Sequence, residues 1–182
     1  MAQATISLLK SNGTVESIDC DSGGALYQAG WLLYNEYQDL DKIKKLLSLG
    51  SLLKLKKDID IPLGVEHSNY YEQKDICVFK DRDAMKMAPS KHYTLTQYID
   101  NMSQKIDKDY LFDEKENQWK FLSPTLLKLY PLNSSMLASY GLTPSQRDKI
   151  QQDIYAEKVT AQRDKLASAL LPRPFHTKGI KI

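Results

Sequence analysis

Two adjacent glycines, Gly23 and Gly24, stand between a predicted strand and a predicted helix, in the stretch DCDSGGALYQAG that begins at residue 19. A glycine-rich turn at such a place can gather backbone N–H groups around a phosphate. This stretch lacks the Lys-Ser or Lys-Thr ending of a phosphate loop, and Asp19 and Asp21 would repel an anion. The sequence favours a turn at Gly24, with Gly30 allowing the helix to pack close to the sheet, and no cofactor is expected.

Cysteine and histidine supply the other candidates for chemistry. Cys20 and Cys77 could meet His67 or His92 in space as a nucleophile and its base, but no local signature pairs them. The two cysteines lack C-x-x-C spacing, and a metal site from Asp19, Cys20, Asp21 and His67 is not supported, because no two of these residues form a pair at i, i+3 or i, i+4 on a predicted helix. We therefore expect two buried structural thiols, no metal site and no enzymatic activity.

The composition is typical of a globular protein. The chain has 182 residues, of which 42% are apolar and 26% are charged, enough to bury a core without disulfides. No stretch of 18 apolar residues indicates a membrane span, and the N-terminus lacks the pattern of a signal peptide. The two cysteines fit a reducing compartment, so we expect a cytoplasmic location and no membrane partner.

The first 122 residues alternate between strand and helix signals. The Asn12-Gly13 pair predicts a tight hairpin within ATISLLKSNGTVESIDC, residues 4–20, whose second strand begins with Val15 and Ile18. Helical spacing begins at Leu26. A second helix follows a cap at Asp39 or Asp41, and Gly50 is its stop signal. The segment SLLKLKKD, from residue 51, is expected to be a short helical continuation beyond that glycine. These signals predict that residues 1–122 form one domain.

The rest of that domain contains another strand, a helix and a hairpin. DICVFK, from residue 75, is apolar on both faces and predicts a buried strand. Thr94 or Thr96 is expected to cap a helix that runs to Ser103, and residues 110–122 read as a hairpin. The predicted fold class is α+β, with a small antiparallel sheet packed with helices.

Residues 123–182 are predicted to be a helical extension with one long helix. Pro124 suits the first turn of a short helix in SPTLLKLY. Thr143-Pro144-Ser145-Gln146 is a helix start signal, and nothing interrupts helical spacing from Pro144 to Leu171. The apolar stripe of this helix is thin, which favours pairing with a partner over packing on its own domain.

Charge differs between the two parts. Residues 1–122 carry 16 Lys/Arg and 19 Asp/Glu, whereas residues 123–182 carry nine and four. The excess is too modest for bulk DNA binding, but the basic end could contact an acidic protein surface or a nucleic acid backbone. Exposed tyrosines could add anchors for a protein partner. The candidate partner-binding residues are Tyr70, Tyr71, Arg147, Lys149, Tyr155, Lys158, Arg163, Lys165 and Arg173.

Several stretches of residues 1–122 occur in the order of a known family. They are SIDC from residue 17, YQDLDKIKKLLSLGSLLKL from residue 37, His67-Ser68, ICVFKDRDA from residue 76 and YLFDEKENQWKF from residue 110. Through these stretches and their order, the chain resembles a family of small bacteriophage and prophage accessory proteins. That family has C-H-W-D-G-Y-P after its first hairpin, whereas this chain keeps only Cys20 and Gly24 of that stretch. The resemblance implies that any site built on the missing His, Trp and Asp is lost.

The resemblance also implies a function. Small phage proteins of this kind often bind a host machine and block it, so we expect a non-enzymatic inhibitor of a bacterial defence system in the cytoplasm of the host cell. The first candidate is an anti-CRISPR protein that binds a Cas effector nuclease with its guide RNA and blocks DNA binding or cleavage. Two alternatives stay open, a virion structural or assembly protein and a small nucleotide-acting enzyme built on the Gly23-Gly24 turn.

Overall fold

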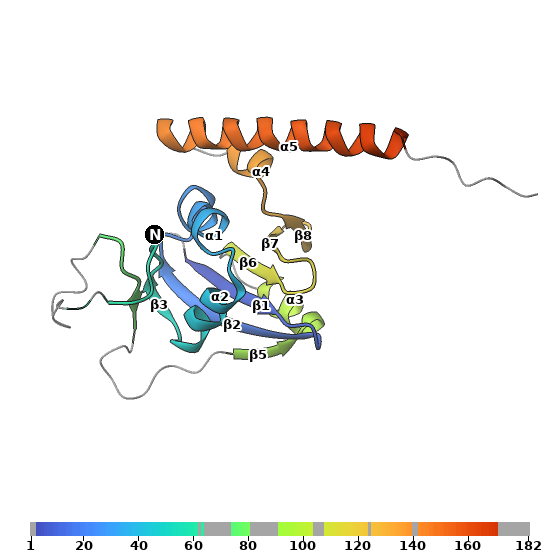
Figure 1. The fold of residues 1–182 in the computed structure, drawn as a ribbon. Helices are drawn as coiled ribbons and strands as arrows, with labels where there is room; N and C mark the ends of the chain where they lie inside the picture. Colours follow the sequence, from blue (N-terminus) through green and yellow to red (C-terminus); the bar gives the residue numbers. More distant parts are fainter. Residues whose placement is uncertain are drawn as a thin grey trace, which may run out of the picture. The chain divides into compact units, whose positions relative to one another are not determined.

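The chain divides into two compact units, Met1–Leu142 and Thr143–Ile182. The computed structural model describes residues 3–61, 63, 74–80, 91–103, 108–123, 125–139 and 142–170. Figure 1 shows the first unit as a sheet with helices against it and the second as one long helix, α5. The α+β fold class is therefore confirmed, including the long C-terminal helix.

In the described part of the first unit, eight strands form one sheet in the order β4-β3-β2-β1-β6-β7-β8, with β5 pairing with β2. The strands are β1 (Ala4–Leu9), β2 (Thr14–Ser22), β3 (Leu52–Lys54), β4 (Val78–Phe79), β5 (Lys91–Thr94), β6 (Lys108–Asp113), β7 (Gln118–Ser123) and β8 (Lys128–Pro131). The helical elements of this unit are the π-helical turn η1 (Leu26–Gly30), α1 (Trp31–Glu36), α2 (Leu40–Ser48), α3 (Leu95–Ser103) and α4 (Ser134–Ala138).

The sheet is mixed, so the predicted antiparallel sheet is wrong in this respect. β1 pairs with β6 in parallel and β2 pairs with β3 in parallel, while the other pairs are antiparallel. Parallel pairing requires a connection that returns the chain to the end of the sheet where the first strand began. The connection from β2 to β3 carries α1 and α2, and the connection before β6 carries α3.

Local signals set several boundaries as predicted. Gly13 has φ +85°, and the Asn12 side chain accepts a hydrogen bond of 3.0 Å from the Thr14 N–H, which closes the β1–β2 hairpin. The Asp39 carboxylate caps α2 by accepting a bond from the Lys42 N–H, and Gly50 follows that helix with φ +82°.

The cap of α3 is also confirmed. Gln97 N–H donates to the Thr94 hydroxyl at 3.2 Å, and the Gln97 side chain accepts from the Thr94 N–H at 3.0 Å. This reciprocal arrangement satisfies two donors that the first turn of a helix leaves without partners.

Two helix predictions are wrong, because both segments pair with neighbouring strands and become part of the sheet. Residues 52–54 form β3, in which buried Leu52 pairs with Cys20 of β2. Residues 128–131 form β8, in which Tyr130 pairs with Phe121 of β7. Because β8 belongs to the sheet, the first compact unit extends to Leu142, beyond the predicted boundary at residue 122. Strand β5 and helix α4 had no sequence prediction.

Helices cover both faces of the sheet. On one face, the buried Trp119 indole donates a hydrogen bond of 2.6 Å to the Tyr37 carbonyl after α1, and α2 lies against β1 and β2 (Figure 1). On the other face, α3 packs Tyr98 and Met102 against the sheet. The sheet residues in this second cluster are Val15, Leu111 and Leu122. Because strand side chains alternate between faces, β6 and β7 place Phe112 and Trp119 in one core and Leu111 and Leu122 in the other.

The second unit begins with the predicted capping box. The Thr143 hydroxyl accepts from the Gln146 N–H, and the Gln146 side chain accepts from the Thr143 N–H at 2.9 Å. Helix α5 then runs over 27 residues, Pro144–Leu170, or roughly 40 Å at 1.5 Å per residue. None of the helices in the described part of the chain has the length and apolarity needed to cross a bilayer.

Candidate protein-binding surface on the C-terminal helix

The glycine pair is used by the fold itself. Gly23 has φ +76°, which favours glycine, and its carbonyl accepts from the Ala29 N–H. A Cβ on Gly24 would lie 2.3 Å from the backbone carbonyl oxygen of Gln3, so only glycine fits there. The Tyr110 hydroxyl donates a buried hydrogen bond of 2.8 Å to the Gly24 carbonyl. These contacts account for Gly23 and Gly24 as a turn held against β1 and β6.

Gly30 plays the packing role that the sequence predicts. A Cβ there would lie 3.1 Å from the Leu26 side chain and 3.3 Å from the Tyr110 ring. The helix therefore approaches the sheet closely at this point.

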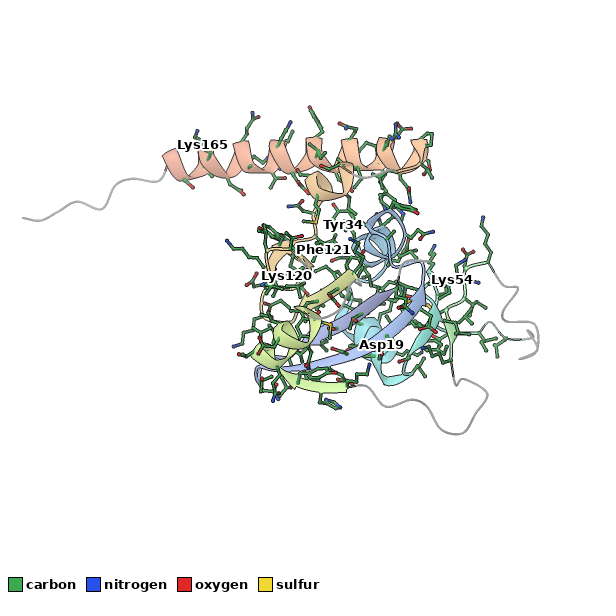
Figure 2. The ribbon with its side chains drawn as sticks, turned by 180° about the vertical axis from the view of Figure 1, so that it is seen from behind. Asp19, Tyr34, Lys54, Lys120, Phe121 and Lys165 are labelled. Atoms are coloured by element: carbon green, nitrogen blue, oxygen red, sulfur yellow. The ribbon has the colours of Figure 1, made fainter. Side chains whose placement is uncertain are left out.

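The acidic residues around the turn are paired with lysines. Lys91 of β5 forms an ion pair with Asp19, and Lys80 pairs with Asp21 at 2.7 Å. Asp19 lies on β2 within the sheet (Figure 2). These ion pairs join β2 to segments far away in the sequence, so the carboxylates serve the fold.

The cysteines are buried and free, as predicted. The Cys77 sulfur lies 3.1 Å from the Tyr37 hydroxyl and accepts from the Lys56 N–H at 3.2 Å. Burial raises the pKa of the Cys20 thiol and that of the Tyr37 hydroxyl, so both stay protonated at neutral pH. His67 lies outside the described residues. In the described part of the chain, no three His, Cys, Asp or Glu side chains are grouped as metal ligands.

A shallow pocket of about 510 Å³ lies beside α2, lined by Asp41, Lys42, Lys45, Asp58, Ile59 and Asp60. Lys45 pairs with Asp60 at 2.7 Å across it. The Lys42 ammonium donates to the carbonyl oxygens of Glu36 and Lys57, each at 2.9 Å. Both lysines of the pocket therefore bond to protein atoms.

The structure brings six of the predicted partner-binding residues onto α5. They are Arg147, Lys149, Tyr155, Lys158, Arg163 and Lys165, and all are exposed. The other three, Tyr70, Tyr71 and Arg173, lie outside the described residues. Figure 2 shows Lys165 in the later part of the helix.

The middle of α5 is exposed on all sides. Ile150 is the only buried residue among the described side chains of the helix, and Ile154 is half-buried. Every residue from Tyr155 to Lys165 is exposed, with Tyr155 at 70% and Val159 at 42%. Exposed large apolar side chains at helical spacing are a sign of a contact surface.

Six of the nine charges of α5 fall into two stripes. The helix carries five basic and four acidic residues, so it is nearly neutral as a whole, and most of the positive excess of residues 123–182 lies outside it. Arg147, Lys158 and Lys165 share one side, because separations of seven and eleven residues are two and three turns. The acidic residues Asp153, Glu157 and Asp164 share another side. A partner therefore meets a basic side and an acidic side at different positions around the helix.

Two exposed apolar features were missed by the residue predictions. Val159 was not among the predicted contact residues, although its seven-residue spacing from Leu166 was an available signal. Leu126 and Leu127 form an exposed turn between β7 and β8, at 65% and 45% exposure, and Leu127 has φ +50°. The two leucines were interpreted as part of a helix, which concealed their exposure.

Comparison with protein-family models, with curated proteins and with solved structures finds no match for this chain. The resemblance to small phage accessory proteins therefore stays a prediction.

Proposed function

We propose that this chain is a non-enzymatic binding protein that inhibits a bacterial defence system, with a guide-loaded Cas nuclease as its target, and that α5 is its contact surface. The observation that carries the proposal is the exposed run from Tyr155 to Lys165. The phage origin rests on the resemblance within residues 1–122, and the exposure of α5 supports a contact surface of the kind that such an inhibitor needs.

An exposed helix of this kind fits a protein contact. A helix in a protein gains most of its stability from packing an apolar face against other residues. Tyr155 and Val159 lie one turn apart and leave such a face exposed to solvent. Tyrosine is also one of the residues that most often dominate binding energy, because its ring buries a large area with few rotatable bonds. A partner that covers these side chains would gain apolar burial and stabilise α5.

The two units have separate tasks in this proposal. The Met1–Leu142 unit is a folded platform, and α5 occupies the surface of the nuclease that target DNA must reach. The tail beyond the helix contains Arg173, Lys178 and Lys181. These charges would add contacts to the guide RNA backbone or to an acidic protein surface.

The test is an affinity capture with the tagged full-length chain. Lysate from bacteria that express a guide-loaded Cas nuclease is applied and washed at low and at high salt, and bound protein and nucleic acid are both identified. Val159→Glu places a charge in the apolar stripe, and Thr160→Glu is the matched control. The control adds the same charge at an exposed, β-branched neighbour on another side of the helix.

We expect the nuclease to remain bound at high salt, Thr160→Glu to retain it and Val159→Glu to lose it. Capture of nucleic acid alone, lost as salt rises, would replace the proposal with backbone charge binding. Capture of phage particles or shell subunits would replace it with the virion assembly alternative. Thermal stabilisation by a nucleotide without capture of any protein would favour the enzyme alternative.

A further inference from the structure

Helix α5 contains a heptad pattern in its exposed part. With Gln152 at position a, the later a positions are Val159 and Leu166, and the d positions are Tyr155, Gln162 and Ala169. This assignment places the two large exposed apolar side chains, Tyr155 and Val159, in one seam. A seam of this type matches the repeat that a second helix can follow by placing its side chains between those of the first.

Basic residues flank the seam. Lys158 and Lys165 fall at g and Arg163 at e, and all three are exposed. The acidic residues Glu157 and Asp164 fall at f, on the side of the helix away from the seam. Side chains at e and g set the choice of partner in a helix pair, because they face the charges of the other helix. The two flanks of the seam therefore carry only positive charge.

A second copy of this chain is a poor match for the seam. In a parallel pair, position g of one helix faces e of the other, so Lys158 would meet Arg163. In an antiparallel pair, g faces g and e faces e, so lysine would meet lysine and arginine would meet arginine. Like charges in both orientations disfavour self-association and select a partner of opposite charge.

We propose that the α5 seam binds an amphipathic helix of another protein whose apolar seam is flanked by Asp and Glu. The inference rests on the proposed function only in that α5 is the contact surface, and it names the chemistry of the partner. Tyr155 and Val159 supply apolar contact, and the three basic residues supply orientation and selectivity. A nucleic acid backbone would pair with the charges but leave the apolar seam uncovered.

The experiment uses the full-length chain and two labelled synthetic peptides of about three heptads. Both peptides carry Ile at a and Leu at d, and they differ only in carrying Glu or Lys at e and g. Fluorescence anisotropy measures binding at about 50 mM and about 500 mM salt. We expect the Glu peptide to bind at least about tenfold more tightly than the Lys peptide, with the difference shrinking at high salt.

Variants separate the seam from general charge. Replacing Lys158, Arg163 and Lys165 together by Glu should reverse the preference, so that the Lys peptide binds more tightly. Val159→Glu should abolish binding of the Glu peptide, and Thr160→Glu should leave it within about twofold. Sedimentation of the chain without peptide should show a monomer.

Three outcomes would overturn the inference. The first is equal binding of the two peptides. The second is self-association that Val159→Glu abolishes, which would assign the seam to a second copy. The third is tight binding of a single-stranded RNA while neither peptide binds, which would assign the basic residues to nucleic acid. Because no nuclease is present, success here with failure of the nuclease capture would reject the proposed target and keep the partner chemistry.

Discussion

The Met1–Leu142 unit and helix α5 use apolar residues in opposite ways. In the first unit, Ile6, Leu8 and Tyr110 are fully buried. In α5, Tyr155 and Val159 are exposed, and six of the nine charges of the helix fall into two stripes. The difference indicates that intramolecular packing determines the apolar residues of the first unit, whereas the exposed apolar residues of α5 are those that the proposed contact would cover. Substitutions in the first unit and in α5 can test this contrast.

The largest expected effect is at Gly24. A Cβ there would lie 2.3 Å from the Gln3 carbonyl oxygen, so Gly24→Ala must shift β1 or the turn. We expect a loss of about 3 kcal/mol in the free energy of unfolding, measured with urea. Gly13→Ala is the control, because Gly13 has positive φ but no atom within 4 Å of the added Cβ, so it should lose only about 1 kcal/mol. Equal losses would show that the contact with the Gln3 carbonyl does not limit the residue at position 24.

A buried hydrogen bond gives the next effect. Trp119→Phe removes the indole donor and leaves the buried Tyr37 carbonyl without its 2.6 Å partner. We expect a loss of about 2 kcal/mol in the free energy of unfolding. Tyr155→Phe, which also removes one polar group from an aromatic side chain but in α5, should change it by less than about 0.5 kcal/mol. Similar losses for both would contradict the contrast between the two regions.

A smaller effect concerns the free energy of unfolding at acidic pH. The Ser11 hydroxyl and N–H and the Lys44 ammonium bond to Glu114, which lowers its pKa from 4.5 to about 2. A carboxyl with a lowered pKa in the folded state contributes stability above its unfolded pKa. This contribution is lost as pH falls from 4.5 towards 2. We expect Glu114→Gln to weaken the pH dependence of the urea midpoint in that window, and an unchanged slope would reject the assignment.

The smallest expected effect on stability is in α5. Val159→Glu exchanges an exposed apolar residue for a better helix former, so the free energy of unfolding should change by less than about 0.5 kcal/mol. Thr160→Glu should behave in the same way. Thermal unfolding followed by circular dichroism provides the measurement. A loss above about 2 kcal/mol for Val159→Glu alone would show that Val159 packs within the chain.

Sequence signals predicted the elements whose causes are local. Asn12-Gly13 closes a hairpin, Asp39 and Thr94 cap helices, and Thr143 with Gln146 starts α5, because each acts within a few residues. These interactions join residues that are close in the sequence, so a short stretch of sequence is enough to predict them.

The features that the sequence analysis missed depend on contacts between residues far apart in the sequence. Leu52 and its neighbours became a strand because β2 pairs with them, although the segment follows a helix directly. The turn at Gly24 was predicted, but its dependence on the Gln3 carbonyl and the Tyr110 hydroxyl was not. For the candidate site, the helix start signal and the helical spacing placed six of the candidate residues on α5, whereas the exposure of Tyr155 and its basic neighbours comes from the structure.

The most direct test of the central claim is inhibition of DNA cleavage by a guide-loaded Cas nuclease, measured with three full-length chains. They are the unmodified chain, Val159→Glu and Thr160→Glu, all with equal thermal stability. The account predicts inhibition by the unmodified chain and by Thr160→Glu, and at least about a tenfold weaker inhibition by Val159→Glu, since it places a charge in the apolar seam. Equal inhibition by all three chains would contradict the role of the seam, and no inhibition by the unmodified chain would contradict the proposed target.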